Sequence, residues 1–281
     1  MSLKKQVKKI INLLLRPVNY RITSKGLQHS LVEEHSTIEK LYRNSIDQIQ
    51  EYYSEFLDKN YKLSAQRTKL LQNLLGTEIT EALHIISSVQ KTLKLDGDIC
   101  EFGIAQGATS ALLANEIIDT NKSLWLFDSF NGLSMPTEKD ILIDDISNFG
   151  SMEKYAGSMA TPVSSVNNKL KNIGFPNNRV KIVPGFIEKS ILQNNLPEKV
   201  SFAYVDFDFY EPIKVALNFL DKVLVENGEI IIDDYGFFST GSQFAVDEFH
   251  EENKSKYHLI KPIKFAGHFV ILKKVSDTQN K

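Results

Sequence analysis

The sequence predicts an α/β fold, in which helices cover both faces of a mostly parallel sheet of seven strands. Short apolar runs typical of buried strands alternate with segments of helical spacing through residues 91–275. Two of these runs, 202–208 and 229–235, end abruptly in carboxylates, and a helical segment at 211–225 with a stop at Gly228 joins them. The pattern indicates a β-α-β unit within an open parallel sheet.

The first expected strand, at 97–102, leads into a turn that contains two glycines, and a helix follows. Gly103 and Gly107 permit close approach by a ligand, and the helix start at Thr109 and Ser110 presents free backbone amides to it. This arrangement is typical of a nucleotide-binding turn.

The second expected strand, at 123–127, ends in Asp128, about twenty residues beyond the last glycine of the turn. A nucleotide-binding fold places at that point the carboxylate that accepts hydrogen bonds from ribose hydroxyls. The turn has Glu101 before its first glycine rather than the Gly-x-Gly-x-x-Gly of dinucleotide sites. An acid there would repel a pyrophosphate but would attract a cationic ligand, which favours S-adenosylmethionine.

The carboxyl ends of neighbouring parallel strands meet at one edge of the sheet. We therefore expect Asp206, Asp208, Asp233 and Asp234 to converge there. Converged carboxylates repel one another, and a hard divalent cation is the usual remedy. The sequence thus predicts a metal site beside the cofactor turn.

Five ordered motifs resemble the macrocin O-methyltransferase family over roughly residues 80–275. They are Glu101-Phe-Gly103 to Gly107, Asp128-Ser-Phe-Asn-Gly-Leu133, Val205-Asp-Phe-Asp-Phe-Tyr-Glu-Pro212, Gly228 to Asp233-Asp-Tyr235, and Ala245-Val-Asp-Glu-Phe249. The resemblance implies a Rossmann-like class I methyltransferase, from a bacterial family whose Mg²⁺-dependent members methylate sugar hydroxyls. It leaves open whether the acceptor is a cell-surface glycan or a secondary metabolite.

The resemblance also implies roles for individual residues. Asp206, Asp233 and Asp234 would hold Mg²⁺, and Asp206 would also accept the proton, since the lysine that catechol O-methyltransferases carry three residues later is Phe209 here. Asp208 would contact the metal ligands rather than the metal itself. The expected cofactor contacts are Glu101, Phe102, Gly103, Gly107, Ala108, Thr109, Ser110, Asp128, Ser129, Phe130, Gly185 and Phe186.

Two other functions remain as alternatives. Asp206-Phe-Asp208 is also an Asp-x-Asp motif, by which many membrane-associated glycosyltransferases hold a metal and a sugar nucleotide. The Glu101-Phe-Gly103 turn and the Asp233-Asp234 pair argue against that fold. A non-catalytic binding module that keeps the methyltransferase fold is the second alternative.

The composition limits which classes of partner and which cellular compartment we expect. The 281 residues carry a formal net charge of −2, which gives no electrostatic case for nucleic acid. The one cysteine, Cys100, falls inside an expected strand, so no disulfide framework exists and a cytoplasmic location is expected.

The remaining segments complete the expected organisation. Residues 1–28 have the pattern of a basic amphipathic helix, which would either lie on the inner membrane surface or dock on the domain or on a second subunit. Residues 29–90 are expected to form a helical cap, and 134–176 a lid over the crevice. Residues 257–274 are expected to close one sheet edge as an antiparallel pair, and 276–281 to be a disordered tail.

Overall fold

The computed structural model describes residues 45–59, 61–262 and 266–275. The chain divides into two compact units, 1–49 and 50–281, and only the helical residues 45–49 of the first unit are described. The expected basic helix at 1–28, the first part of the expected cap at 29–44 and the expected tail at 276–281 lie outside the described residues.

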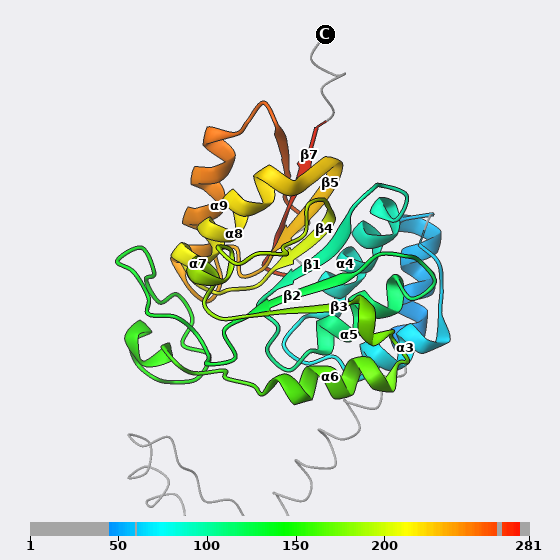
Figure 1. Ribbon diagram of the computed structural model, residues 1–281, viewed down its shortest axis with the longest axis horizontal. Coiled ribbons are helices and arrows are strands. Elements are labelled where there is room, and N and C mark those ends of the chain that lie inside the picture. Colours follow the sequence, from blue (N-terminus) through cyan, green and yellow to red (C-terminus); the bar gives the residue numbers. More distant parts are fainter. Residues whose placement is uncertain (1–44, 60, 263–265, 276–281) are drawn as a thin grey trace, which may run out of the picture. The chain divides into compact units, whose positions relative to one another are not determined.

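A seven-stranded sheet forms the centre of the second unit, with strand order β3-β2-β1-β4-β5-β7-β6 (Figure 1). The first five strands in this order are parallel, and β7 runs antiparallel to both β5 and β6. The predicted mostly parallel sheet and its antiparallel closing pair are therefore confirmed. The strands are β1 Asp98–Phe102, β2 Leu124–Asp128, β3 Val180–Pro184, β4 Val200–Val205, β5 Leu224–Ile232, β6 Tyr257–Ile260 and β7 Val270–Lys274.

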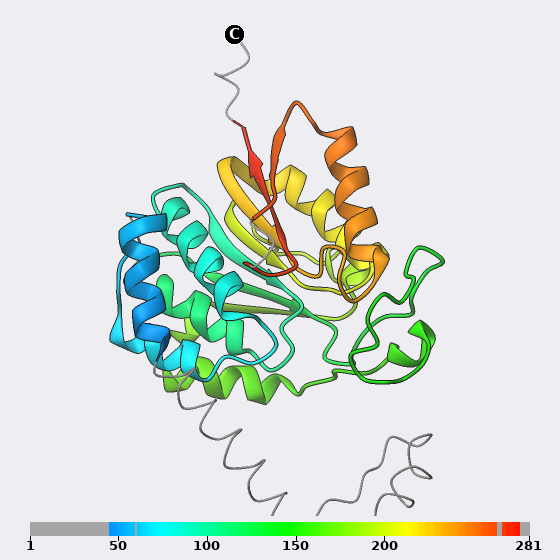
Figure 2. The same cartoon turned by 180° about the vertical axis from the view of Figure 1, so that it is seen from behind.

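Helices cover both faces of the sheet, as Figures 1 and 2 show from opposite sides. Helices α4, α5 and α6 contribute to one apolar core, whereas α7, α8 and α9 contribute to the other. The helical elements are η2 Tyr53–Leu57, α3 Ala65–Gln72, α4 Ile79–Thr92, α5 Ala108–Glu116, η3 Met152–Tyr155, α6 Val163–Asn172, η4 Asn177–Arg179, α7 Ile187–Ser190, α8 Tyr210–Val223 and α9 Thr240–Glu252.

Strand β4 shows why the sheet is buried on both sides. Its side chains alternate, so that Phe202 and Tyr204 join one core while Ala203 and Val205 join the other, and all four are at most 1% exposed. A strand buried in this way reads in the sequence as a continuous apolar run. The run ends where the chain emerges at the edge of the sheet, which brings the acids that follow it to the surface of a pocket.

Two boundaries differ from the sequence expectation. Helix α8 ends at Val223, because Leu224 is already extended and pairs with Val200, so Gly228 lies inside β5 and does not stop the helix. Helix α4 packs its Ile85 and Val89 on the sheet core, so the later part of the expected cap is a layer of the α/β fold. Among the helices of the described residues, none combines the length and apolar character needed to cross a bilayer.

The long segment 134–176 is tied to the rest of the fold by hydrogen bonds. Leu142 forms an isolated antiparallel bridge with Ser239, and the Asp140 carboxylate accepts the backbone N–H of Tyr210 at the start of α8 over 2.7 Å. The Asp145 carboxylate accepts hydrogen bonds from the Tyr155 hydroxyl and from two backbone amides, and so organises the loop.

Candidate functional site

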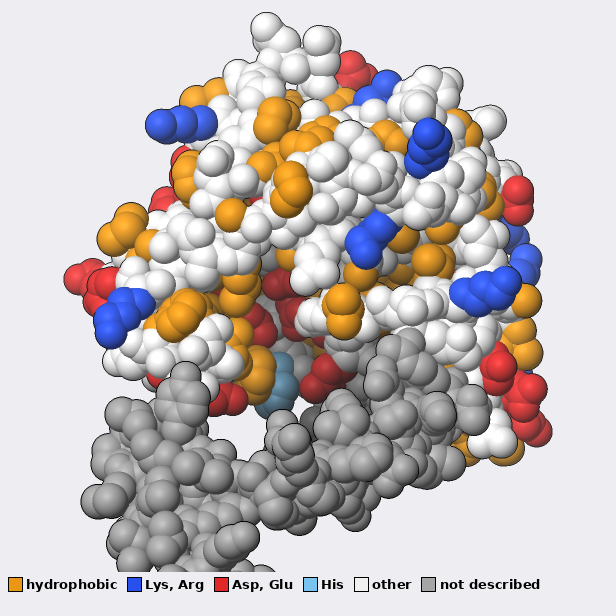
Figure 3. Space-filling view, turned by 90° about the horizontal axis from the view of Figure 1, so that it is seen from below, with side chains coloured by type: hydrophobic (Ala, Val, Ile, Leu, Met, Phe, Trp, Pro, Cys, Tyr) orange, Lys and Arg blue, Asp and Glu red, His pale blue; other side chains and the backbone are white. Residues whose placement is uncertain are grey.

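A cavity of about 280 Å³ opens at the carboxyl edge of the sheet. Seen from below, the surface is hollowed and acidic side chains lie in the hollow (Figure 3). One set of lining residues comes from the ends of β1, β2, β4 and β5, and another from the segment 134–176 and the start of α7. The lining is Gly76, Gly103, Ala105, Asp128, Ser129, Gly132, Leu133, Ser134, Ile146, Met159, Phe186, Ile187, Glu188, Asp206, Phe207, Asp208, Pro212, Asp233, Asp234 and Phe237.

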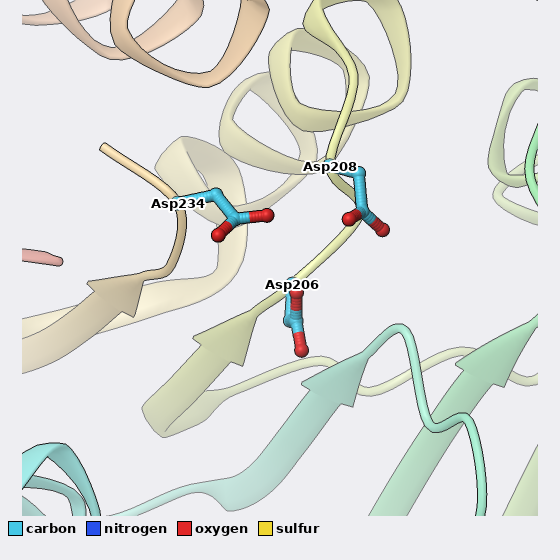
Figure 4. A group of neighbouring side chains, drawn as sticks. All are labelled: Asp206, Asp208 and Asp234. Carbon is cyan, nitrogen blue, oxygen red and sulfur yellow. The ribbon is translucent and has the colours of Figure 1, made fainter. Parts of the chain in front are cut away.

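Three carboxylates of this lining lie close together. One oxygen each of Asp206, Asp208 and Asp234 falls within 4.8 Å of the other two. Asp206 and Asp208 follow the end of β4, and Asp234 follows the end of β5 (Figure 4). We call these three residues the acid trio. The predicted convergence of acids at this edge is thus observed, with Asp208 as a full member.

Local backbone geometry brings the acid trio together. Asp208 and Asp234 have φ values of 62° and 56°, in the left-handed region that Asp tolerates better than most side chains. Gly103 has φ 84°, and a Cβ on it would lie 1.8 Å from the carbonyl oxygen of Asp206. The predicted close approach at Gly103 is therefore an approach by neighbouring backbone, which only glycine allows.

The electrostatics of the acid trio are unfavourable without a cation. Within the described part of the chain, no group outside the trio donates a hydrogen bond to these three carboxylates, and no lysine or arginine pairs with them; the Asp208 and Asp234 carboxyl groups lie within hydrogen-bonding reach of each other. Burial, followed by the neighbouring carboxylates, raises the pKa of Asp206 and of Asp234 well above the usual range. Burial also raises the pKa of Asp208, to about 7.

Asp233 lies differently from its neighbour Asp234. Its side chain is buried, and its two carboxylate oxygens accept hydrogen bonds from the Tyr204 hydroxyl over 2.8 Å and from the Asp234 backbone N–H over 2.7 Å. Glu81 of α4 lies beside it and is 2% exposed. Asp233 therefore borders the cavity but does not join the closely spaced oxygens of the trio.

The cofactor side of the cavity is formed by the ends of β1 and β2 and by the start of α7. Four of the expected cofactor residues line it, namely Gly103, Asp128, Ser129 and Phe186. The Asp128 carboxylate accepts the backbone N–H groups of Ile104 and Phe130 over 2.8 and 2.6 Å. Each of its oxygens keeps a second lone pair that a ligand hydroxyl can use.

The other expected cofactor residues do not line the cavity. Glu101 is buried and accepts a hydrogen bond from the Ser110 hydroxyl, and burial raises its pKa to about 8. Phe102 stacks on Phe127 in the core, and the Thr109 hydroxyl pairs with that of Thr77. The remaining members shape the turns around the cavity: Gly107 precedes α5 in the left-handed region, Ala108 begins α5, Phe130 follows Asp128, and the Gly185 N–H bonds the Asp128 carbonyl.

Two features of the site were not expected from the sequence. The long segment was expected to lie over the crevice, but its sequence shows no periodicity that would single out Ile146 and Met159, which line the cavity beside Leu133. Glu81 did leave a signal, because it shares the helical stripe of Ile85 and Val89 although it is an acid on an apolar face. An acid in that position indicates a buried polar partner.

Comparison with known proteins identifies the family. A model of the macrocin O-methyltransferase family matches residues 10–269. No curated protein matches the chain at the level of sequence.

Solved structures of methyltransferases share the fold at low sequence identity. The O-methyltransferase NovP is 18% identical with a TM-score of 0.62, over 85% of this chain and 100% of that one. The calicheamicin methyltransferase CalS11 is 17% identical with a TM-score of 0.56, over 82% and 91%. An O-methyltransferase from Bacillus cereus in complex with SAH is 16% identical with a TM-score of 0.51, over 82% and 100%.

These structures confirm the Rossmann-like methyltransferase fold, and the family model spans most of the sequence. Membership also favours methyl transfer over the glycosyltransferase and the non-catalytic alternatives. The chain belongs to the macrocin O-methyltransferase family and is an S-adenosylmethionine-dependent O-methyltransferase.

Proposed function

We propose that this enzyme transfers the methyl group of S-adenosylmethionine to a hydroxyl of a sugar or glycosylated small molecule, with Mg²⁺ held by Asp206, Asp208 and Asp234. The observation that carries the metal site is the contrast in hydrogen bonding at one sheet edge. The acid trio has no donor among the described residues outside the trio, whereas neighbouring Asp128 and Asp233 each accept two hydrogen bonds from other groups.

The residues of the trio fit a magnesium ion. Mg²⁺ takes oxygen ligands at about 2.1 Å, so its ligand oxygens stand about 3 to 4 Å apart. The trio oxygens lie within 4.8 Å of one another and need only a small closure to reach that spacing. This ligand set has Asp208 where the sequence favoured Asp233, because the closely spaced oxygens at this edge belong to Asp206, Asp208 and Asp234.

The cofactor contacts that we propose are those that face the same cavity. Asp128 would accept hydrogen bonds from the ribose hydroxyls, and Ser129, Phe186 and Gly103 would line the adenosine. Glu101 would act on the cofactor site indirectly. It accepts a hydrogen bond from Ser110 and so helps to hold the start of α5. The methyl donor and the acid trio would then share one cavity.

The chain's own residues would do the remaining chemistry. Asp206 would accept the proton of the acceptor hydroxyl, since its carboxylate faces the cavity and no described residue donates a hydrogen bond to it. The apolar side chains of Leu133, Ile146 and Met159 would cover the reacting groups. A dication at the trio would supply electrostatic stabilisation for the charge that develops on the acceptor oxygen.

A sugar acceptor is supported by the family and by one fold neighbour. CalS11 is described as a TDP-rhamnose 3′-O-methyltransferase. We further propose that the basic segment 1–28 contacts either the inner membrane surface or a second subunit, as its sequence pattern indicates.

The test measures production of S-adenosylhomocysteine by purified enzyme with methyl donor, Mg²⁺ and a panel of glycosides and nucleotide sugars. Turnover of at least one sugar should disappear with EDTA and return with added Mg²⁺. An equal rate in the presence of EDTA would exclude the metal role. Failure of S-adenosylhomocysteine to bind at micromolar concentrations would exclude the cofactor assignment.

A further inference from the structure

A buried polar group lies directly behind the acid trio. Glu81 on α4, Tyr204 on β4 and Asp233 after β5 meet there, and their exposed fractions are 2%, 1% and 9%. They come from three elements that are far apart in the sequence. We call them the support group.

Hydrogen bonds hold both the side chain and the backbone of Asp233. The Tyr204 hydroxyl donates to one carboxylate oxygen over 2.8 Å and the Asp234 backbone N–H donates to the other over 2.7 Å. The Ser242 hydroxyl donates to the Asp233 carbonyl oxygen over 2.7 Å. The Asp233 side chain therefore holds the backbone of Asp234, which is the left-handed residue whose carboxylate joins the trio.

Glu81 completes the support group from the helix side. Its carboxyl lies within hydrogen-bonding reach of Asp233 and of the Tyr204 hydroxyl, and its Oε1 atom has no hydrogen-bond partner in the described part of the chain. Packing does not explain an acid at this place. An apolar side chain would continue the stripe of Ile85 and Val89 without the cost of burying a polar group.

We propose that Glu81 is a positioning residue: with Tyr204 it holds the Asp233 carboxyl, and through it keeps the left-handed Asp234 turned toward Asp206 and Asp208. This inference rests on the proposed metal site. It adds a residue that acts on the metal only through other residues. Glutamine at this position would keep a hydrogen-bond donor toward Asp233 through its amide. Loss of such supporting hydrogen bonds commonly weakens metal binding 10- to 100-fold.

Three substitutions separate positioning from packing. Glu81→Met fills the space but donates no hydrogen bond, Glu81→Gln keeps a donor toward Asp233, and Tyr204→Phe removes the other donor. Ser87→Ala is the matched control, because it deletes a different buried hydrogen bond, to Asp58, on the same helix. For each protein we would measure Mn²⁺ affinity by electron paramagnetic resonance, S-adenosylhomocysteine affinity by calorimetry, and the metal-free melting temperature.

We expect Glu81→Met and Tyr204→Phe to weaken Mn²⁺ binding about tenfold or more, with cofactor affinity changed less than about threefold. Glu81→Gln should bind Mn²⁺ within about threefold of the parent, and Ser87→Ala should match the parent whatever its melting temperature. Parent-like Mn²⁺ affinity in both Tyr204→Phe and Glu81→Met would overturn the inference. If Glu81→Met does not fold, equal affinity in the parent and Tyr204→Phe overturns it. A parent that binds no Mn²⁺ would instead overturn the metal site itself.

Discussion

The acid trio and the support group lie side by side at one sheet edge, yet their carboxyl groups are held in opposite ways. Asp206, Asp208 and Asp234 face the cavity and receive no hydrogen bond from the described residues outside the trio. Asp233 is buried behind them, and each of its carboxylate oxygens accepts a hydrogen bond. Proximity of acids therefore does not by itself define a metal site. At this edge, the acids that no group outside the trio hydrogen-bonds are the proposed metal ligands.

The largest expected effect is at Asp206, which is proposed both as a metal ligand and as the proton acceptor. Asp206→Asn should lower kcat about 10³-fold, because the amide cannot accept the proton and is a poorer ligand. S-adenosylhomocysteine should still bind within about threefold of the parent. Steady-state kinetics and calorimetry check both values. The exposed loop acid Asp144 offers a control, and loss of kcat in Asp144→Asn of similar size would break the comparison.

A second prediction concerns Glu101, a buried acid outside both groups. Its pKa is raised from about 4.5 to about 8, chiefly by burial. The unfolded chain therefore loses this proton at lower pH than the folded chain, and the free energy of unfolding falls as pH rises from about 4.5 to about 8. Glu101→Gln should remove that fall, on the order of 5 kcal/mol, in urea titrations across this window. Parallel curves for parent and variant would contradict the burial account.

The third prediction compares how substitutions of Asp208 and of Asp233 change the free energy of unfolding. Asp208→Asn should stabilise the metal-free protein by about 1 to 2 kcal/mol, because it removes a charge from a repelling trio. Asp233→Asn should destabilise it by about 1 to 3 kcal/mol, because an amide nitrogen then faces a donor. Urea unfolding in EDTA measures both. The same sign for the two variants would erase the distinction between ligand and support.

The smallest effect is expected at the long segment. Asp145→Asn should lower the melting temperature slightly, because the carboxylate accepts hydrogen bonds from the Tyr155 hydroxyl and from the amides of Phe149 and Gly150. Asp144→Asn, one residue earlier, should change stability by less than about 0.5 kcal/mol. Thermal unfolding of the two variants measures whether the acid that accepts three hydrogen bonds contributes more to stability than its neighbour. A larger loss in Asp144→Asn would reverse the assignment.

The sheet and its acid-bearing edge were predictable, because buried parallel strands leave continuous apolar runs and the acids follow them directly. The strand before Asp206 and the strand before Asp233 both lie where these runs occur. The helix end at Val223 was missed, because Leu224 begins to pair with Val200, a contact between distant segments that local spacing does not encode.

The identity of the closely spaced acids was harder to predict, because it depends on backbone angles beyond the strand ends. Alternation along a strand does not reveal that Asp208 and Asp234 turn into the left-handed region. The hydrogen bonds that commit Asp233 elsewhere come from Tyr204, 29 residues away, and from its own neighbour. Such partners become visible only when the folded elements are placed side by side.

The most direct test is a crystal structure of the enzyme with Mn²⁺ and S-adenosylhomocysteine, with the ion located by its anomalous scattering. The account predicts a peak about 2.2 Å from one oxygen each of Asp206, Asp208 and Asp234, with Asp233 still bonded to Tyr204. A peak ligated by Asp233 in place of Asp208, or no peak at this edge at saturating Mn²⁺, would contradict it.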